Sequence, residues 1–370
     1  MIKTAFITTV NHNVGDDFVR EGLKYLLRQR FKGAALQFES IHKHAPITSR
    51  YGFENRRGQR KSNRLDKRLP LWLSRDRIIE ADLVVQSGAP VYWCHDQVKS
   101  HCWQNEWFTP LIRRRLAKSK AALLNLAAGS CQTYFSQGTE FCSACNDYIR
   151  EFYHLSQVTT LRDKVAKSIL KKINLHAPVI PCSSIFAVDE YGMSDQGADY
   201  VVVNFMPMAA HYDFGQNINQ ARWRNEFSRF YDQIKKKERV VFVCHDVVEK
   251  EAALSLDPGA EIFFAPNDFA AFMRFYSRAK YGVMNRVHGA FMMAAFGKPS
   301  FVIGNDTRAR MVEEIGLQSA FVHDVSADLL LEKAAQLQSG SASYREQFVA
   351  IKEKAFIDYM GALDVLADLS

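Results

Sequence analysis

Short apolar runs alternate along the chain with longer segments in which apolar residues recur at helical spacing. In the first half, the apolar runs predict strands at 2–9, 34–38, 81–86, 121–126 and 158–161. A helix is predicted over 17–31, where the apolar residues fall on one face. Strands of four to eight residues that alternate with helices are typical of a parallel sheet with covering helices.

A second alternating series begins near residue 199. It predicts strands at 200–204, 239–244, 262–265, 280–284 and 300–303, separated by helices such as 219–237 and 247–255. The proline-containing and polar stretch before it predicts a hinge. We therefore expect an α/β protein with two Rossmann-like, doubly wound domains, residues 1–185 and 196–340, followed by an amphipathic helix over 341–370. Two such domains facing each other across a cleft resemble the GT-B architecture, in which ligands bind at the carboxyl ends of the strands.

The composition supports a globular protein. A length of 370 residues suggests two domains, and a hydrophobic content of 47% excludes wholesale disorder. No stretch approaches the roughly 18–20 apolar residues of a membrane-spanning helix. The first ten residues turn polar too early for a signal peptide, so we expect a cytoplasmic protein. Seven cysteines without a dense framework are expected to be reduced thiols.

The positive charge is concentrated in one place. The net charge is +8, and residues 50–77, with ten basic and three acidic side chains, contribute +7 of it. This is not the broad basic face of a nucleic-acid-binding protein, so we expect no nucleic-acid partner. The surrounding segment 40–78 has no clear period and predicts an inserted loop or short helices. This segment is either a solvent-exposed surface loop or a surface that attracts anionic lipid headgroups or a polyanionic substrate.

The most informative motif lies at residues 281–290. A buried strand is predicted to end at Asn285 and a helix to begin near Val287, which places Arg286 and His288 beside a helix N-terminus. A guanidinium, an imidazole and free backbone N–H groups suit a phosphate or carboxylate. The alternative interpretation is that Arg286 forms a structural ion pair and His288 caps the helix.

Arg162 occupies a similar position in the first half. It ends a predicted strand, and Asp163 after it is a good N-cap for a helix over 164–172. Arg162 either forms a salt bridge within its domain or faces a ligand. If the two domains face each other, Arg162 and Arg286 together suit a small ligand with two anionic groups.

Three polar turns follow strands of the first half, at 11–17, 87–90 and 128–130. Their glycines allow a backbone to come close to a ligand. None of them is a nucleotide-binding fingerprint. Asp16 or Asp17 either acts as a base, binds a sugar hydroxyl or caps a helix.

The cysteines and remaining histidines carry weaker signals. Cys142 and Cys145 have metal-like spacing, and Cys94, His95, His101 and Cys102 are the residues that would complete a site. Without a matching second pair, buried thiols are favoured and no metal is expected. His211, His245 and Trp223 are isolated, with no role beyond packing or acceptor contact.

The chain resembles the polysaccharide pyruvyl transferase family along nearly its whole length. The resemblance rests on residues 13–16, 87–90 and 161–163, and above all on 285–290 with 297–299. It implies transfer of the pyruvyl group of phosphoenolpyruvate onto two hydroxyls of a sugar, which forms a ketal and releases phosphate without a metal or cofactor. It also implies a donor site of Arg162, Arg286, His288, Asn285 and Gly289, in which His288 is the general acid. One departure is Pro181-Cys182, where family members often carry Asp-Pro.

The acceptor is expected on the first domain. The expected acceptor residues are Asn13, Gly15, Asp16, Asp17, Ser87, Gly88, Gly129 and Ser130, with Asp17 also catalytic. A lipid-linked acceptor would give residues 50–77 a role in peripheral contact with the inner membrane. Two alternatives remain: a nucleotide-sugar-dependent GT-B glycosyltransferase, and a non-catalytic glycan- or phosphoester-binding protein.

Overall fold

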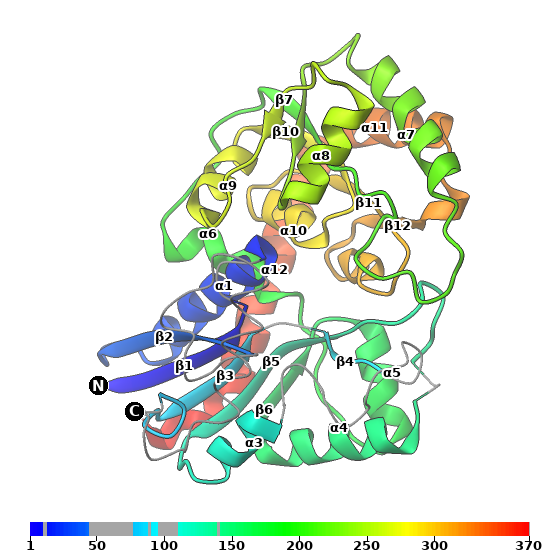
Figure 1. Ribbon diagram of the computed structural model, residues 1–370. Helices are drawn as coiled ribbons and strands as arrows, with labels where there is room; N and C mark the ends of the chain where they lie inside the picture. Colours follow the sequence, from blue (N-terminus) through cyan, green and yellow to red (C-terminus); the bar gives the residue numbers. More distant parts are fainter. Residues whose placement is uncertain (10–12, 44–76, 88–89, 95–109, 139–140, 370) are drawn as a thin grey trace. The chain divides into compact units, whose positions relative to one another are not determined.

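The computed structural model describes residues 1–9, 13–43, 77–87, 90–94, 110–138 and 141–369 (Figure 1). The chain forms two compact units. Unit 1 consists of residues 1–130, 137–183 and 356–370, and unit 2 consists of residues 131–136 and 184–355.

Unit 1 is built on a parallel sheet in the order β2-β1-β3-β5-β4, with β6 also paired to β5. Its strands are β1 (Ile2–Thr8), β2 (Leu36–His42), β3 (Leu83–Ser87), β4 (Pro90–Tyr92), β5 (Ala122–Ser130) and β6 (Ser156–Leu161). Its helices are α1 (Val14–Arg30), α3 (Pro110–Leu116), α4 (Ser143–Leu155) and α5 (Lys164–Lys172). Apolar side chains of α4 and α5 pack with those of β1, β3 and β5 into one core.

Unit 2 repeats this plan with the parallel order β12-β11-β10-β7-β8-β9. Its strands are β7 (Tyr200–Val203), β8 (Val240–Val243), β9 (Ile262–Phe263), β10 (Ala279–Met284), β11 (Ser300–Gly304) and β12 (Gln318–Phe321). Its α-helices are α6 (Ala187–Glu190), α7 (Gln220–Ile234), α8 (Val247–Leu256), α9 (Phe269–Tyr276), α10 (Val287–Ala295) and α11 (Ala327–Ser339). Short 3₁₀ helices lie at Ser183–Phe186, Ala309–Ile315 and Val322–Asp324.

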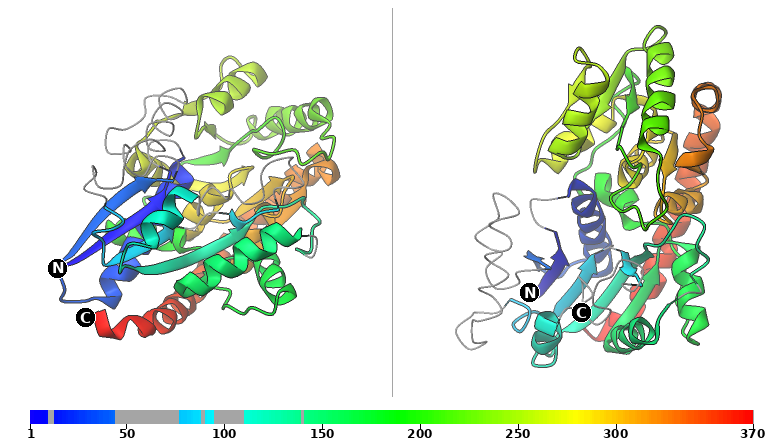
Figure 2. Two further views of the ribbon diagram at one scale, coloured as in Figure 1. Left: turned by 60° about the horizontal axis from the view of Figure 1, so that its bottom comes forward. Right: turned by 45° about the vertical axis from the view of Figure 1, so that its right-hand side comes forward.

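The last long helix, α12 (Ser341–Leu363), begins in unit 2 and ends in unit 1. A 3₁₀ helix, Asp364–Leu369, follows it. Within unit 1, the Tyr359 hydroxyl donates to the carbonyl oxygen of Pro181 at 3.0 Å, and Arg30 Nε donates to the carbonyl oxygen of Leu363 at 3.1 Å. Figure 2 shows the red end of α12 against unit 1 in both views.

Each sheet has a switch point at its first strand, and this locates the favoured ligand edge. In unit 1 the chain moves from β1 to β2 on one side and to β3 on the other. In unit 2 it moves from β7 through β8 to β9, and then returns to place β10 on the other side of β7. In open parallel sheets, ligands bind outside the carboxyl ends of the strands at such a switch point. The residues after β1 and β3, and those after β7 and β10, therefore occupy the favoured positions.

The predicted fold class, two Rossmann-like units of the GT-B kind, is confirmed. The cleft expected between the domains stays a prediction. The predicted inserted loop 40–78 begins later than expected, because residues 40–42 continue β2 and pair with residues 6–8 of β1. Residues 44–76 lie outside the described residues. The first helix begins at Val14 and not at residue 17, because Asn13 caps it.

The units also differ from the predicted domains 1–185 and 196–340, and from the separate helix 341–370. Residues 131–136 belong to unit 2, where Gln132 and Thr307 exchange two hydrogen bonds. Residues 356–370 belong to unit 1, because the buried Tyr359 and Leu363 complete its packing. Among the described helices, none is both long and apolar enough to cross a bilayer.

Candidate active site

Arg286 lies at the carboxyl end of β10, where it is the N-cap residue of α10. Its guanidinium is largely buried and makes three contacts. Nε donates to the Glu249 carboxylate, Nη2 donates to Asp246 Oδ2 at 2.7 Å, and Nη1 donates to His211 Nε2 at 2.6 Å. A guanidinium has five N–H groups, so these contacts leave two for a ligand. Arg286 therefore forms the ion pairs that the alternative interpretation expected, and its guanidinium keeps N–H groups that can bind a ligand.

Glu249 fixes the orientation of this arginine from the first turn of α8. It is buried, and its Oε2 accepts from the His245 backbone N–H at 2.7 Å and from Asn204 Nδ2 at 3.0 Å. Burial raises the pKa of Glu249, and the positive charge of Arg286 acts in the opposite direction. Glu249 thus connects the ends of β7, β8 and β10 around one guanidinium.

Asp246 is the more exposed carboxylate of the pair, with 39% of its side chain accessible. Its Oδ1 caps α8 by accepting from the Glu249 N–H at 3.0 Å, while Oδ2 contacts Arg286. An anion bound to the two remaining N–H groups would lie beside the Asp246 carboxylate, and the two like charges would repel each other.

Three histidines lie near this cluster and differ in what they can do. His211 accepts from Arg286, and since arginine has no acceptor, its Nε2 is unprotonated in this contact. His245 is buried and its Nε2 lies 2.8 Å from the Tyr276 hydroxyl. Burial lowers the pKa of His245 well below its usual value, and the nearby charges of Arg286 and His288 lower it further. His288, in the first turn of α10, is partly exposed. It is therefore the histidine best suited to deliver a proton to a ligand.

Asn285 and Gly289, both expected at the donor, have packing roles in the structure. Asn285 Oδ1 accepts from the Met206 N–H, and Nδ2 donates to the carbonyl oxygen of Ile303, both at 2.8 Å. A Cβ at Gly289 would lie 2.6 Å from the Tyr276 hydroxyl. Asn285 thus holds the ends of β7 and β11 beside β10, and Gly289 makes room for the Tyr276 hydroxyl.

In unit 1, four of the eight residues expected to bind the acceptor lie at the N-cap and in the first turn of α1. Asn13 Oδ1 accepts from the Gly15 N–H at 3.1 Å, and Asp16 accepts from the Thr9 hydroxyl at 2.6 Å. Asp17 is paired with Arg20 at 2.6 Å. Burial raises the pKa of Asp17 to about 6, although Arg20 acts against that rise. A carboxyl group that titrates near neutral pH is suited to general acid–base chemistry.

Arg162 lies at the end of β6 and is buried against β5. A Cβ at Gly129 would overlap its guanidinium, and its Nη1 donates to Cys182 Sγ at 3.9 Å. The group that comes close to the Gly129 backbone is therefore the Arg162 guanidinium, where a ligand was expected. Asp163 caps α5 as predicted, by accepting from the Ala166 N–H at 2.7 Å. It also accepts from the hydroxyl of Ser130 at 2.8 Å, so Ser130 serves this cap.

The remaining acceptor residues follow β3. Ser87 is completely buried, and its hydroxyl has no hydrogen-bond partner within the protein, as judged from the described ranges. Gly88 lies outside the described residues, as do residues 50–76 of the basic segment. The structure therefore brings Arg286 and His288 together in unit 2, and Asn13 to Asp17 together in unit 1.

Glu249, Asp246, His211 and Tyr276 were not predicted from the sequence. The signal for two of them was present, because a short buried strand ends before Cys244-His245-Asp246 and a helix follows. The same strand-end argument that identified Arg286 applies to this turn. His211 and Tyr276 had no such signal, since their position depends on how loops and helices pack.

Three solved structures share the fold. The UDP-GlcNAc 2-epimerase of Methanocaldococcus jannaschii with UDP-GlcNAc and UDP is 10% identical, with a TM-score of 0.52 over 91% of this chain and 93% of that chain. S. aureus MnaA with UDP is 13% identical, with a TM-score of 0.51 over 94% and 91% of the two chains. The Neisseria meningitidis UDP-GlcNAc 2-epimerase with UDP-GlcNAc is 12% identical, with a TM-score of 0.51 over 94% and 93%. At these identities, the likeness shows the fold alone.

The comparison with curated proteins found no match. The model of the family described as polysaccharide pyruvyl transferase matches residues 13–307, which include both helix starts discussed above. Because this match covers most of the chain, the protein belongs to the polysaccharide pyruvyl transferase family.

Proposed function

We propose that the protein transfers the pyruvyl group of phosphoenolpyruvate to a sugar of a polysaccharide or of its precursor, forming a pyruvate ketal and releasing phosphate. The observation that carries the proposal is the place of Arg286 and the partly exposed His288 at the start of α10, at the switch point of unit 2. The family match supports a transferase of this kind. Phosphoenolpyruvate carries a phosphate and a carboxylate, and a guanidinium binds either group through paired N–H donors.

In the proposed reaction, His288 donates a proton to the methylene carbon of phosphoenolpyruvate. Positive charge develops at the adjacent carbon, and an acceptor hydroxyl attacks there and loses its proton. The bond from this carbon to the phosphate oxygen then breaks, and phosphate leaves with the electron pair. The second hydroxyl attacks the same carbon and closes the ketal, and its proton returns to His288, which is thereby restored as the acid. A positioned acid of this type typically contributes about 10²–10⁴-fold to the rate.

Two residues of unit 1 complete the proposal. Asp17 would accept the proton of the attacking hydroxyl, since its pKa of about 6 leaves it mostly ionised at pH 7. Arg162 would hold the second anionic group of the donor. The proposed reaction uses no metal or cofactor.

The first experiment is calorimetric titration with phosphoenolpyruvate, and in parallel with uridine- and guanosine-diphosphate sugars. The Arg286→Ala variant tests the site, and Arg274→Ala, which removes a 63% exposed arginine from α9, is the matched control. We expect saturable phosphoenolpyruvate binding that is lost in Arg286→Ala and kept in Arg274→Ala. Binding of a nucleotide sugar with indifference to phosphoenolpyruvate would instead assign the protein to the nucleotide-sugar glycosyltransferases.

A second experiment separates an enzyme from a binding protein. The His288→Ala variant should still bind phosphoenolpyruvate, because Arg286 remains. It should release phosphate about 10²–10⁴-fold more slowly in the presence of a sugar acceptor. Binding without phosphate release from the wild-type protein, across a panel of acceptors, would favour a non-catalytic role.

A further inference from the structure

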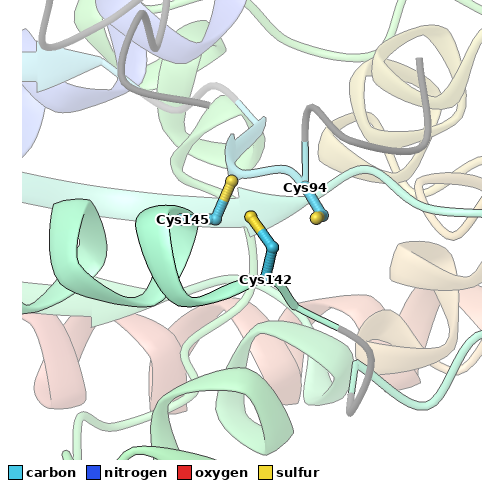
Figure 3. A group of neighbouring side chains, drawn as sticks. All are labelled: Cys94, Cys142 and Cys145. Carbon is cyan, nitrogen blue, oxygen red and sulfur yellow. The ribbon is translucent and has the colours of Figure 1, made fainter. Parts of the chain in front are cut away.

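Three cysteines of unit 1 come together at the start of α4. Cys142 is the N-cap residue of this helix, Cys145 lies in its first turn, and Cys94 follows β4. Their three sulfur atoms all lie within 4.8 Å of one another (Figure 3). Cys94 and Cys145 are buried and Cys142 is partly buried. The sequence alone favoured inert buried thiols, although it named Cys94 among four residues that would complete a site with this pair.

From this cluster we propose that Cys94, Cys142 and Cys145 bind a thiophilic divalent cation of the zinc type. Zinc sits about 2.3 Å from each thiolate, which places tetrahedral sulfurs about 3.8 Å apart. The sulfurs here need to close by no more than about 1 Å to reach that arrangement. Small rotations about the side-chain bonds suffice for such a shift.

The surroundings suit a metal bound by thiolates. The start of a helix presents free N–H groups and a partial positive charge, which favours a negatively charged ligand set. Cys145 Sγ donates to the carbonyl oxygen of Trp93 at 3.6 Å, which places this sulfur beside the end of β4, and this hydrogen bond is lost when the thiol ionises to bind the metal. Three thiolates leave one tetrahedral position, and among the described residues no further histidine, cysteine or carboxylate joins the group. A water molecule or another ligand would take that position.

Binding is balanced by proton release. Three S–H bonds break, three S–metal bonds form, and up to three protons pass to the solvent, so affinity should rise with pH. The bound ion would join the end of β4 to the start of α4, two segments that are distant in sequence. A redox pair would need only two of these cysteines, and the convergence of three favours the metal.

The test begins with the full-length protein purified under reducing conditions. We expect elemental analysis to find about one zinc ion per chain. Removal of the zinc with a chelator and addition of cobalt(II) should produce the near-ultraviolet absorption of thiolate-to-metal charge transfer. Cys94→Ser, Cys142→Ser and Cys145→Ser should each lose most of the metal and of this absorption. Cys244→Ser, which removes a buried thiol of unit 2, should lose neither.

A second measurement uses only the wild-type chain, so misfolding of a variant cannot decide the outcome. Zinc should slow alkylation of Cys94, Cys142 and Cys145 together by more than about tenfold, while Cys131 and Cys182 keep their rates. A metal-free protein whose cobalt spectrum lacks the thiolate band would overturn the proposal. So would a Cys142–Cys145 disulfide in the freshly isolated protein. Neither result depends on pyruvyl transfer, so this proposal and the proposed function fail separately.

Discussion

Neutralising Asp246 should tighten the binding of phosphoenolpyruvate. Asp246 contacts the Arg286 guanidinium and is partly exposed, so a donor bound to the remaining N–H groups would lie beside its negative charge. The Asp246→Asn substitution removes this charge. It keeps an oxygen that can accept from the Glu249 N–H, and asparagine is as good an N-cap as aspartate. The start of α8 should therefore be preserved.

The size of the effect follows from the geometry. An anionic oxygen bound to the same guanidinium would lie about 4 Å from the Asp246 carboxylate, where two like charges repel by about 1 kcal/mol in water and about 4 kcal/mol near a protein surface. Because 39% of the Asp246 side chain is exposed, we take the lower value. A change of about 1 kcal/mol is about a fivefold lower Kd. Salt at high concentration should reduce the gain.

The assay is the calorimetric titration of both proteins with phosphoenolpyruvate at low and high salt. Asp268→Asn is the matched control, since Asp268 also caps a helix of unit 2 by accepting from the Ala271 N–H at 2.8 Å. A gain in affinity cannot arise from misfolding. If Asp246→Asn binds the donor as weakly as the wild-type protein, or more weakly, the Asp246 charge does not repel it.

Three further predictions concern stability. Glu249→Gln should lower the free energy of opening measured by hydrogen exchange in the unit 2 strands by about 2–3 kcal/mol, because the buried Arg286 guanidinium loses its carboxylate partner. The control Glu251→Gln, at an exposed position of the same helix, should leave this free energy unchanged. Unit 1 should lose about 3 kcal/mol as pH rises from about 4 to about 6, because folded Asp17 keeps its proton up to a pKa of about 6 while the unfolded chain ionises near 3.8. Urea unfolding at a series of pH values should show this slope in the wild type and lose it in Asp17→Asn. Gly289→Ala should lower the free energy of unfolding by about 1–3 kcal/mol, because the added Cβ would clash with the Tyr276 hydroxyl. Gly361 lies in a helix and an added Cβ there would have no neighbour within 4 Å, so Gly361→Ala should raise the free energy of unfolding by about 0.5–1 kcal/mol. Thermal unfolding of the two variants measures both effects.

The sequence predicted a strand or helix best where the burial of that element is visible in its own pattern of apolar residues. Buried runs such as 200–204 and 280–284 predicted β7 and β10 within one residue, because these strands are covered on both faces. The strand β12 was missed, since Gln318–Phe321 is polar and only partly buried. The helix α11 was missed as well, although Ser326 caps it.

The site residues likewise divide into those placed by a local element and those placed by long-range packing. Arg286 and His288 could be placed from the sequence, because a strand end and a helix start determine where they lie. What surrounds Arg286 could not be predicted, since Glu249 and His211 reach it from turns after other strands. Gly129 was interpreted as a ligand contact, and the structure fills that space with the Arg162 guanidinium. Long-range packing of this kind leaves no local pattern.

The return of the chain to unit 1 at residue 356 has a consequence for biosynthesis. Tyr359 and Leu363 are buried in unit 1, yet all of unit 2 except residues 131–136 is translated between Pro181 and these residues. At about 5–20 residues per second, the ribosome needs about 10–35 s to cover that distance. Through this interval the nascent N-terminal half lacks part of its packing and exposes the surface that α12 later covers. Unit 2, although second in the sequence, is the first to have all of its residues made.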